Sequence, residues 1–253
     1  MDKDFEPHFL SSTMVFSSNL RVYAATAMQE RRSSIREPLE RRLLYFSIHQ
    51  QMCMAMEDLG AHLYAYREKR SGKDYLSALV NYSGSSAYLY ELLKGKSQQQ
   101  IAAEFGFCDK IPELLRKGGY DEERQARAAR NFYEHLQSIA NHQKKRMGIC
   151  NKLKHGGTIY RPEKPERLGI LLRENGKPRT GNISYNEGEV QTFLYVIATC
   201  AHQLKEIIFQ YFTAHHPTFA EKALESAEVQ EDMRRSVQLI KSLEHVTKKK
   251  AKK

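Results

Sequence analysis

The sequence predicts a mostly α-helical protein, an antiparallel helical bundle with a small β-hairpin excursion. Three observations lead to this prediction. Apolar residues recur at helical spacing over most of the 253 residues, Gly and Pro cluster between these stretches, and a segment at about 168–185 has strand spacing around a turn. Because 41% of the residues are hydrophobic and only 14 are Gly and 7 are Pro, the composition excludes a disordered or fibrous protein.

The first part of the chain is expected to hold an arm and one long helix. Residues 1–32 are Ser-rich and weakly periodic, so we expect an N-terminal arm with at most a short helix near residues 20–31. Pro38 suits a first helical turn, where its missing N–H costs nothing, and apolar residues then recur at helical steps to about Lys69. This pattern predicts a long amphipathic helix.

Shorter helices are predicted next. Residues 75–93 form a second amphipathic stretch, in which Gly84 and its Ser neighbours indicate a kink or a close approach to another helix. Two short helices, 98–105 and about 110–116, follow on either side of a turn at Gly106.

A second long helix and the hairpin come after a Gly-Gly pair. Three acidic residues at 121–123 place negative charge at a helix N-terminus, where the helix dipole favours it, and the predicted helix extends to Lys154. Strand-like runs at 168–173 and 179–185 flank an Asn-Gly pair, which predicts a β-hairpin. Since a two-stranded hairpin is not stable alone, we expect it to lie on the helices.

The last part of the chain is again helical. Residues 188–212 are apolar over a wide arc, so this helix is expected at the centre of the core. Pro217 ends it, and a final amphipathic helix is predicted over about 220–246. We therefore divide the chain into an N-terminal arm (1–32), a helical domain with the hairpin (33–216), and a C-terminal helix with a basic tail (217–253).

The charge of the chain favours a polyanionic partner. The formal net charge is 40 − 30 = +10, and without the five lysines of the tail KKKAKK it is 35 − 30 = +5. A basic tail attracts phosphate without sequence preference. The alternative interpretation is a solvated, disordered chain end. No apolar run approaches the roughly 20 residues that cross a bilayer, and the N-terminus has no signal-peptide pattern. We therefore expect a cytoplasmic protein with no membrane partner.

The candidate chemistry lies in the helix that begins near residue 121. Arg130, Asn131 and His135 form the pattern R-N-x-x-x-H, and Asn151 and His155 repeat its N-x-x-x-H core. Side chains four residues apart differ by about 40° around a helix, so each Asn and His point the same way. An imidazole beside a permanent cation suits proton transfer at a ribose 2′-hydroxyl and stabilisation of charge on phosphate, and this chemistry requires no metal.

These residues resemble a known superfamily. A helical bundle with R-x4-6-H, often with Asn directly after the Arg, is similar to the HEPN superfamily, and Arg130, Asn131 and His135 match its motif. The second copy departs from the motif, because Cys150 stands where the Arg would be and Arg146 lies one helical turn earlier. Many HEPN members are metal-independent endoribonucleases of toxin–antitoxin and phage-defence systems, and they commonly act as dimers with the motif at the shared face.

The resemblance implies an RNA-acting protein, a metal-independent endoribonuclease of an antiviral defence or toxin-type system. It implies no cofactor and no metal, RNA as a partner, an antitoxin or other defence-system protein as a second partner, and a homodimer. The expected catalytic residues are Arg130, Asn131, His135, Asn151, Lys154 and His155, and the expected nucleic-acid-binding residues are Lys145, Arg146 and Lys152.

Each of these residues also has a plainer interpretation. The stripe that contains His135 is also the pattern of a solvated helix face, and Arg130 belongs to a run of arginines that can pair with the acidic residues at 121–123. Lys154 and His155 before two glycines are also typical of a helix C-cap. The sequence leaves these interpretations open.

The alternative function is a non-catalytic module that binds nucleic acid or protein. Residues 98–117 resemble one helix-turn-helix of AraC-type regulators, in which Gly106 makes the turn and Lys110, Arg116 and Lys117 face DNA. The same residues also suit a plain helix pair in a bundle. A third possibility is a helical adaptor in which the long helices dimerise and the N-terminal arm exchanges between subunits. The chain lacks the phosphate-loop, dinucleotide-binding, zinc-protease and α/β-hydrolase motifs.

Overall fold

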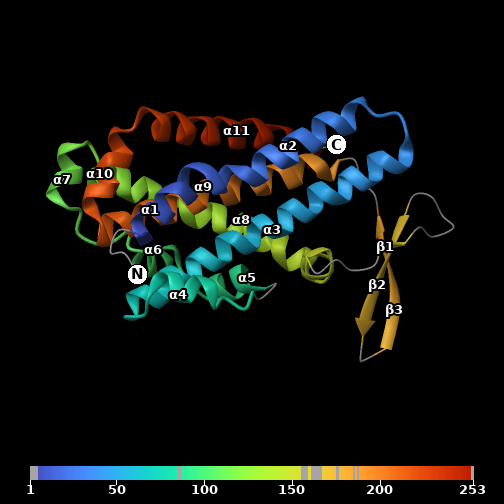
Figure 1. Cartoon of the computed structure of the whole chain (residues 1–253), viewed down its shortest axis with the longest axis horizontal. Helices are drawn as coiled ribbons and strands as arrows, with labels where there is room; N and C mark the ends of the chain where they lie inside the picture. The colour runs from blue at the N-terminus through green and yellow to red at the C-terminus, as the bar shows by residue number, and fades with distance from the viewer. Residues whose placement is uncertain are drawn as a thin grey trace.

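The long helices of the molecule lie side by side along its long axis (Figure 1). This computed structural model describes residues 5–84, 87–154, 159–160, 167–174, 177–184, 186 and 188–251. Its helices are α1 (Phe5–Ser12), η1 (Thr13–Ser17), α2 (Ser18–Ser34), α3 (Pro38–Arg70), α4 (Tyr75–Val80), α5 (Tyr88–Leu93), α6 (Gln98–Glu104), α7 (Glu113–Lys117), α8 (Glu122–Lys154), α9 (Glu189–His215), α10 (Pro217–Glu225) and α11 (Ala227–Ala251). The mostly α-helical class is confirmed, and no helix in this part of the chain is both long and apolar enough to cross a bilayer.

α9 forms the core of the bundle, as its apolar sequence predicts. α2, α3, α8, α10 and α11 pack around it. Its side chains are buried on almost every side, and Phe193, Ile197, Ile208 and Phe212 have no exposed surface. α9 ends at His215, and Pro217 begins α10.

The N-terminal segment belongs to the same core. Residues 1–32, expected to be an arm, are helical from Phe5 onward and pack on α3 and α9. Leu10 and Ala25 are fully buried in the main cluster of apolar residues. η1 is a turn of π-helix, which holds one residue more than an α-helical turn, and it joins α1 to α2. α1 is held by Glu6, which accepts a hydrogen bond from the hydroxyl of Tyr211 on α9.

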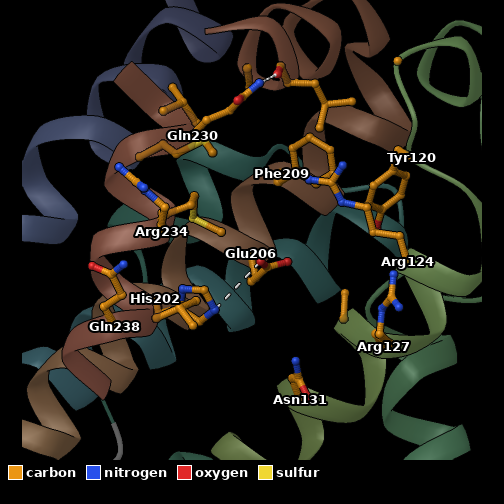
Figure 2. Close-up of a pocket in the computed structure, with 18 of the residues that line it drawn as sticks. Tyr120, Arg124, Arg127, Asn131, His202, Glu206, Phe209, Gln230, Arg234 and Gln238 are labelled. Atoms are coloured by element: carbon orange, nitrogen blue, oxygen red, sulfur yellow. Dashed lines mark hydrogen bonds and ion pairs between the residues drawn. The ribbon is translucent and has the colours of Figure 1, made fainter. Parts of the chain in front are cut away.

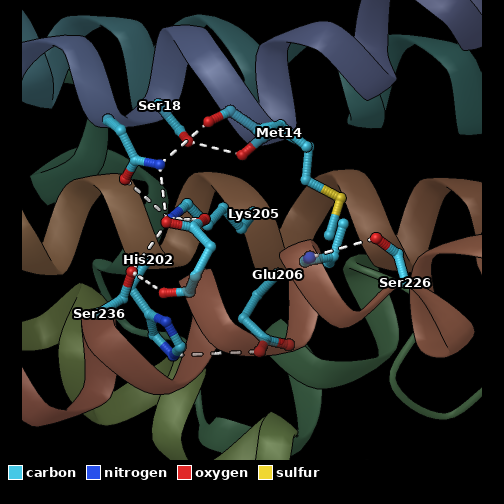
Figure 3. A network of polar contacts seen from close by, with 11 residues as sticks. Met14, Ser18, His202, Lys205, Glu206, Ser226 and Ser236 are labelled. Atoms are coloured by element: carbon cyan, nitrogen blue, oxygen red, sulfur yellow. Dashed lines mark hydrogen bonds and ion pairs between the residues drawn. The ribbon is translucent and has the colours of Figure 1, made fainter.

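A buried polar cluster ties α11 to α9 and α2 (Figure 3). The Lys205 side chain has no exposed surface, and its Nζ donates to Asn19 Oδ1 at 2.9 Å, to Asp232 Oδ2 at 2.5 Å and to Ser236 Oγ at 3.0 Å. Asn19 also donates to Asp232 Oδ1 at 2.8 Å. All three donors of the ammonium group are therefore satisfied, which is what a buried charge requires.

Two predicted helices are broken in the structure. The stretch at 75–93 is not one helix but α4 and α5, because Gly84 between them has a φ of +61°, which a right-handed helix does not contain. The stretch at 220–246 is divided into α10 and α11 at Ser226, whose backbone is extended and whose hydroxyl accepts the Val229 N–H at 3.3 Å. In both places small residues provide turns that the apolar periodicity does not reveal.

The remaining long helices follow the prediction closely. α3 begins at Pro38, and Asp74 caps α4 by accepting the Ser77 N–H at 2.7 Å. α8 starts at the predicted acidic residues, where Asp121 accepts the Arg124 N–H at 2.8 Å, and it runs to Lys154.

Three short strands lie beyond the ends of α8 and α9, away from α7 and α10 (Figure 1). β1 (Ile159–Tyr160), β2 (Arg167–Glu174) and β3 (Lys177–Ser184) form an antiparallel sheet in the order β1-β2-β3. The predicted Asn-Gly turn between β2 and β3 lies outside the described residues. The strands extend from the end of the bundle, so the expectation that they lie on the helices is wrong.

Gly106 occupies a position that other residues tolerate poorly. Its φ is +78°, and a Cβ at this position would overlap the Tyr66 hydroxyl and lie 3.2 Å from Asp109 Oδ2. Gly95 has a similar φ of +72° but nothing within 4 Å of such a Cβ. We expect Gly95→Ala to lower the free energy of unfolding by about 1 kcal/mol, the usual cost of a left-handed backbone, and Gly106→Ala to lower it by about 2 to 4 kcal/mol because of the added overlap. Urea unfolding of both variants measures the difference, and equal losses would contradict the role of Tyr66.

Candidate functional site

A groove of about 750 Å³ lies between α8 and α11, with α9 as its floor and α10 at one end (Figure 2). We call it the α8–α11 groove. Met14 of η1 also reaches its lining. The groove is of the size that small-molecule sites in proteins usually have.

The wall on α8 carries Arg124, Arg127 and Asn131. These residues are three and four positions apart, so they share one face of the helix. Arg127 pairs with Glu123 at 2.8 Å. The Arg124 guanidinium lies over the ring of Tyr120, 5.6 Å from its centroid, and no acidic side chain among the described residues forms an ion pair with it. Arg124 is therefore a cation that a ligand can approach.

The opposite wall is α11, where Gln230, Arg234, Gln238 and Lys241 line the groove. Arg234 Nε donates to a Glu231 oxygen at 2.8 Å. Across the whole described lining there are four cationic side chains and one acidic side chain, Glu206. The groove therefore favours an anionic ligand.

The floor of the groove holds His202 and Glu206, one helical turn apart on α9 (Figure 2). His202 is only 7% exposed, and its Nδ1 has no hydrogen-bond partner. Burial lowers the pKa of His202 to about 3, so the imidazole is neutral at neutral pH. Its Nε2 lies 4.0 Å from Glu206 Oε1, and this contact is not an ion pair while the ring is neutral.

Glu206 is the group in the groove that titrates near neutrality. Its side chain is 19% exposed, and burial raises its pKa to about 7, while the positive charge of Arg124 acts in the opposite direction. A carboxyl group with such a pKa both releases and accepts a proton at physiological pH. General acid–base catalysis is most efficient with such a group.

The structure brings part of the first sequence motif to the groove. Asn131 belongs to the lining. His135, one turn further along α8, is half-buried, and its Nδ1 is 2.7 Å from Gln203 Nε2, with its ring 6.1 Å from the ring of His202. Burial lowers the pKa of His135. Arg130 is exposed and outside the lining, and five residues of α-helix turn it about 140° away from His135.

The second motif is only partly visible. Arg146 pairs with Glu189 at 2.7 Å and lies 4.9 Å from the centroid of Phe193, so it binds the start of α9. Lys145 is exposed on α8. The predicted site residues further along are placed as follows: Asn151, Lys152 and Lys154 belong to the last turns of α8, and His155 lies outside the described residues.

The second helix of the segment at 98–117 is short. α7 has only five residues, about 7.5 Å or little more than one turn of helix. Arg116 pairs with Glu122 at 2.5 Å and Lys117 with Glu113 at 3.3 Å. The cations proposed to face DNA are thus partly neutralised by neighbouring acids.

Sequence reasoning missed the floor of the groove. His202 and Glu206 stand among the apolar residues of α9, and polar residues four positions apart on such a helix are a signal for a buried site. Among the described residues, no three His, Cys, Asp or Glu side chains are grouped so that they could hold a metal ion. In comparisons with known proteins, no family model, no curated protein and no solved structure matches the chain.

Proposed function

We propose that this protein acts on RNA and that the strand lies in the α8–α11 groove. The observation that carries this proposal is the Arg124 guanidinium, which belongs to the lining together with Asn131 and Glu206 and forms no ion pair in the described part of the chain. Cations on both walls suit a backbone with a negative charge at every phosphate. Arg124 and Arg127 take the phosphate-binding role that the HEPN resemblance gives to Arg130.

Cleavage of the strand is the activity that this groove best supports. The Glu206 carboxylate takes the proton from a ribose 2′-hydroxyl, the 2′-oxygen forms a bond to phosphorus, and the bond from phosphorus to the 5′-oxygen breaks. Water supplies the proton that the 5′-oxygen gains, and the products are a 2′,3′-cyclic phosphate end and a 5′-hydroxyl end. Arg124 stabilises the charge that develops on the phosphate oxygens.

His135 has a positioning role beside the groove in this proposal. Its hydrogen bond to Gln203 holds the imidazole next to His202, one turn from Asn131. From this position it orients the floor of the groove. A role in antiviral defence, an antitoxin or other partner protein, and a homodimer rest on the HEPN resemblance and go with this proposal.

Arg234 and Arg235 provide a matched test of RNA binding. Both donate to Glu231, both are exposed, and only Arg234 lines the groove. We expect Arg124→Gln and Arg234→Gln each to weaken binding of a labelled 20-nucleotide single-stranded RNA about tenfold, because each removes a charged contact to phosphate. We also expect the logarithm of the binding constant to fall less steeply with the logarithm of the salt concentration, by about 0.7 in slope. Fluorescence anisotropy over a range of salt concentrations gives both values.

The control is Arg235→Gln, which removes the same charge and is expected to leave the affinity nearly unchanged. Since every variant keeps the basic tail, its contribution cancels. Equal weakening by Arg234→Gln and Arg235→Gln would place the RNA outside the groove. Binding without cleavage would leave the non-catalytic module as the function.

A further inference from the structure

The α8–α11 groove has two chemically different ends (Figure 2). Near α10 its lining is apolar and includes Tyr120, Phe209, Leu224 and Val229. Tyr120 and Phe209 meet edge to face with their centroids 5.1 Å apart. Asn131 and Gln238 lie toward the opposite end, and His202 and Glu206 lie between the two (Figure 2). The charged phosphates of an RNA backbone would gain nothing from contact with the apolar end.

Arg124 stands at the border between these two ends. Its guanidinium lies over the Tyr120 ring, so a permanent positive charge sits directly beside the apolar wall. A ligand that fits both would have a flat apolar part next to an anionic group. Beneath the two ends, the Nε2 of the buried His202 ring faces Glu206, while its Nδ1 is buried without a hydrogen-bond partner.

We propose that the apolar end of the groove receives one unstacked base of a single-stranded RNA, while the phosphate beside that base lies against Arg124. This inference rests on the proposed function and names its substrate class. In an A-form duplex the bases are stacked and paired, so they cannot enter a pocket of this kind, whereas an unpaired base is free to turn out of the strand. Duplex RNA is therefore a poor ligand of the groove.

The test compares ligands that differ by the base alone. AMP is expected to bind about tenfold more tightly than ribose 5-phosphate, because the base removes apolar surface from water at the apolar end and about 1.4 kcal/mol corresponds to a factor of ten. A single-stranded RNA is expected to bind at least tenfold more tightly than a duplex of the same length. Isothermal titration gives the first comparison and fluorescence anisotropy the second.

Ala223→Leu is the variant that fills the apolar end. Ala223 lies on α10, half-buried in the lining, and leucine keeps its helix propensity. The control is Ala126→Leu, an exposed position on α8 outside the lining. We expect Ala223→Leu to bring AMP down to the affinity of ribose 5-phosphate, and Ala126→Leu to leave both unchanged. If Ala223→Leu fails to fold, Leu224→Ala serves as the second variant. It removes part of the same wall and should also weaken the binding of AMP.

The outcomes separate this inference from the proposed function. If AMP and ribose 5-phosphate bind equally, or if a duplex binds as well as a single strand, the base pocket is wrong, while the dependence of RNA binding on Arg124 can still hold. If no RNA binds at any salt concentration, both proposals fail. If AMP binds with the expected preference but its affinity is unaffected by Ala223→Leu and Leu224→Ala, the base lies elsewhere and the inference fails.

Discussion

Replacement of Glu206 by glutamine is expected to lower the rate of RNA cleavage at least about 100-fold, while binding of the strand persists. The amide keeps the shape of the side chain but cannot take a proton, and general-base catalysis usually contributes this much. Because the pKa of Glu206 is raised to about 7, the wild-type rate should increase with pH up to about 7 and then level off. Gel assays of a labelled RNA across this range give the profile. A variant as active as the wild type would remove Glu206 from the mechanism.

The same substitution has an effect on stability that does not depend on any substrate. The folded state holds the Glu206 proton more tightly than the unfolded chain does, so the wild type loses stability as pH rises from about 4.5 to about 7. Glutamine has no such dependence. We expect the stability of Glu206→Gln relative to the wild type to rise by about 3 kcal/mol between about pH 4.5 and pH 8, as measured by urea unfolding. The control Glu228→Gln, at an exposed position on α11, should show no such change.

Asp232→Ala is expected to lower the free energy of unfolding by about 3 to 5 kcal/mol, the largest loss of stability among these variants. The substitution leaves the ammonium group of Lys205 buried with its carboxylate partner removed. Burial already lowers the pKa of Lys205, and Asp232 opposes this shift. In the variant the lysine should lose its proton more readily in the folded state than in the unfolded chain, so its stability should rise with pH in the alkaline range. Urea unfolding at several pH values tests both expectations.

Glu231→Ala is the matched control for Asp232→Ala. Glu231 is the preceding residue on α11, and its partners are the exposed Arg234 and Arg235. Exposed ion pairs contribute little to stability, so the urea midpoint should hardly move. If the two variants lose stability equally, the Lys205 cluster is not what holds α11 to the bundle.

Much of the fold could be predicted from periodicity because the long helices bury one face or all faces. α3 and α8 show their start signals in Pro38 and in the acidic residues at 121–123, and α9 shows its central place in its apolar sequence. The breaks at Gly84 and Ser226 could not be predicted in the same way. Each break depends on a backbone conformation that the spacing of apolar residues does not predict.

The site was harder to predict, because it is assembled from segments far apart in the chain. Asn131 and His135 were found from spacing within one helix, and that spacing also places Arg130 on a different face from His135. The role of Glu206 depends on its burial beneath α8 and α11, and only the packed structure reveals the effect of that burial on its pKa. Among the arginines near the acidic residues at 121–123, Arg127 does pair with Glu123, whereas the place of Arg124 in the groove depends on the packing of distant helices.

The π-helical turn η1 has a consequence for how the length of this chain can vary. Because a π-helical turn holds one residue more than an α-helical turn, deletion of a single residue between Thr13 and Ser17 would leave a regular α-helical turn and hardly rotate α1 relative to α2. Glu6 would then still face Tyr211. Deletion of one residue within the regular helix α2 would instead rotate α1 by about 100° and turn Glu6 away from Tyr211. One-residue deletions should therefore be tolerated better in this short stretch than in the helix that follows it.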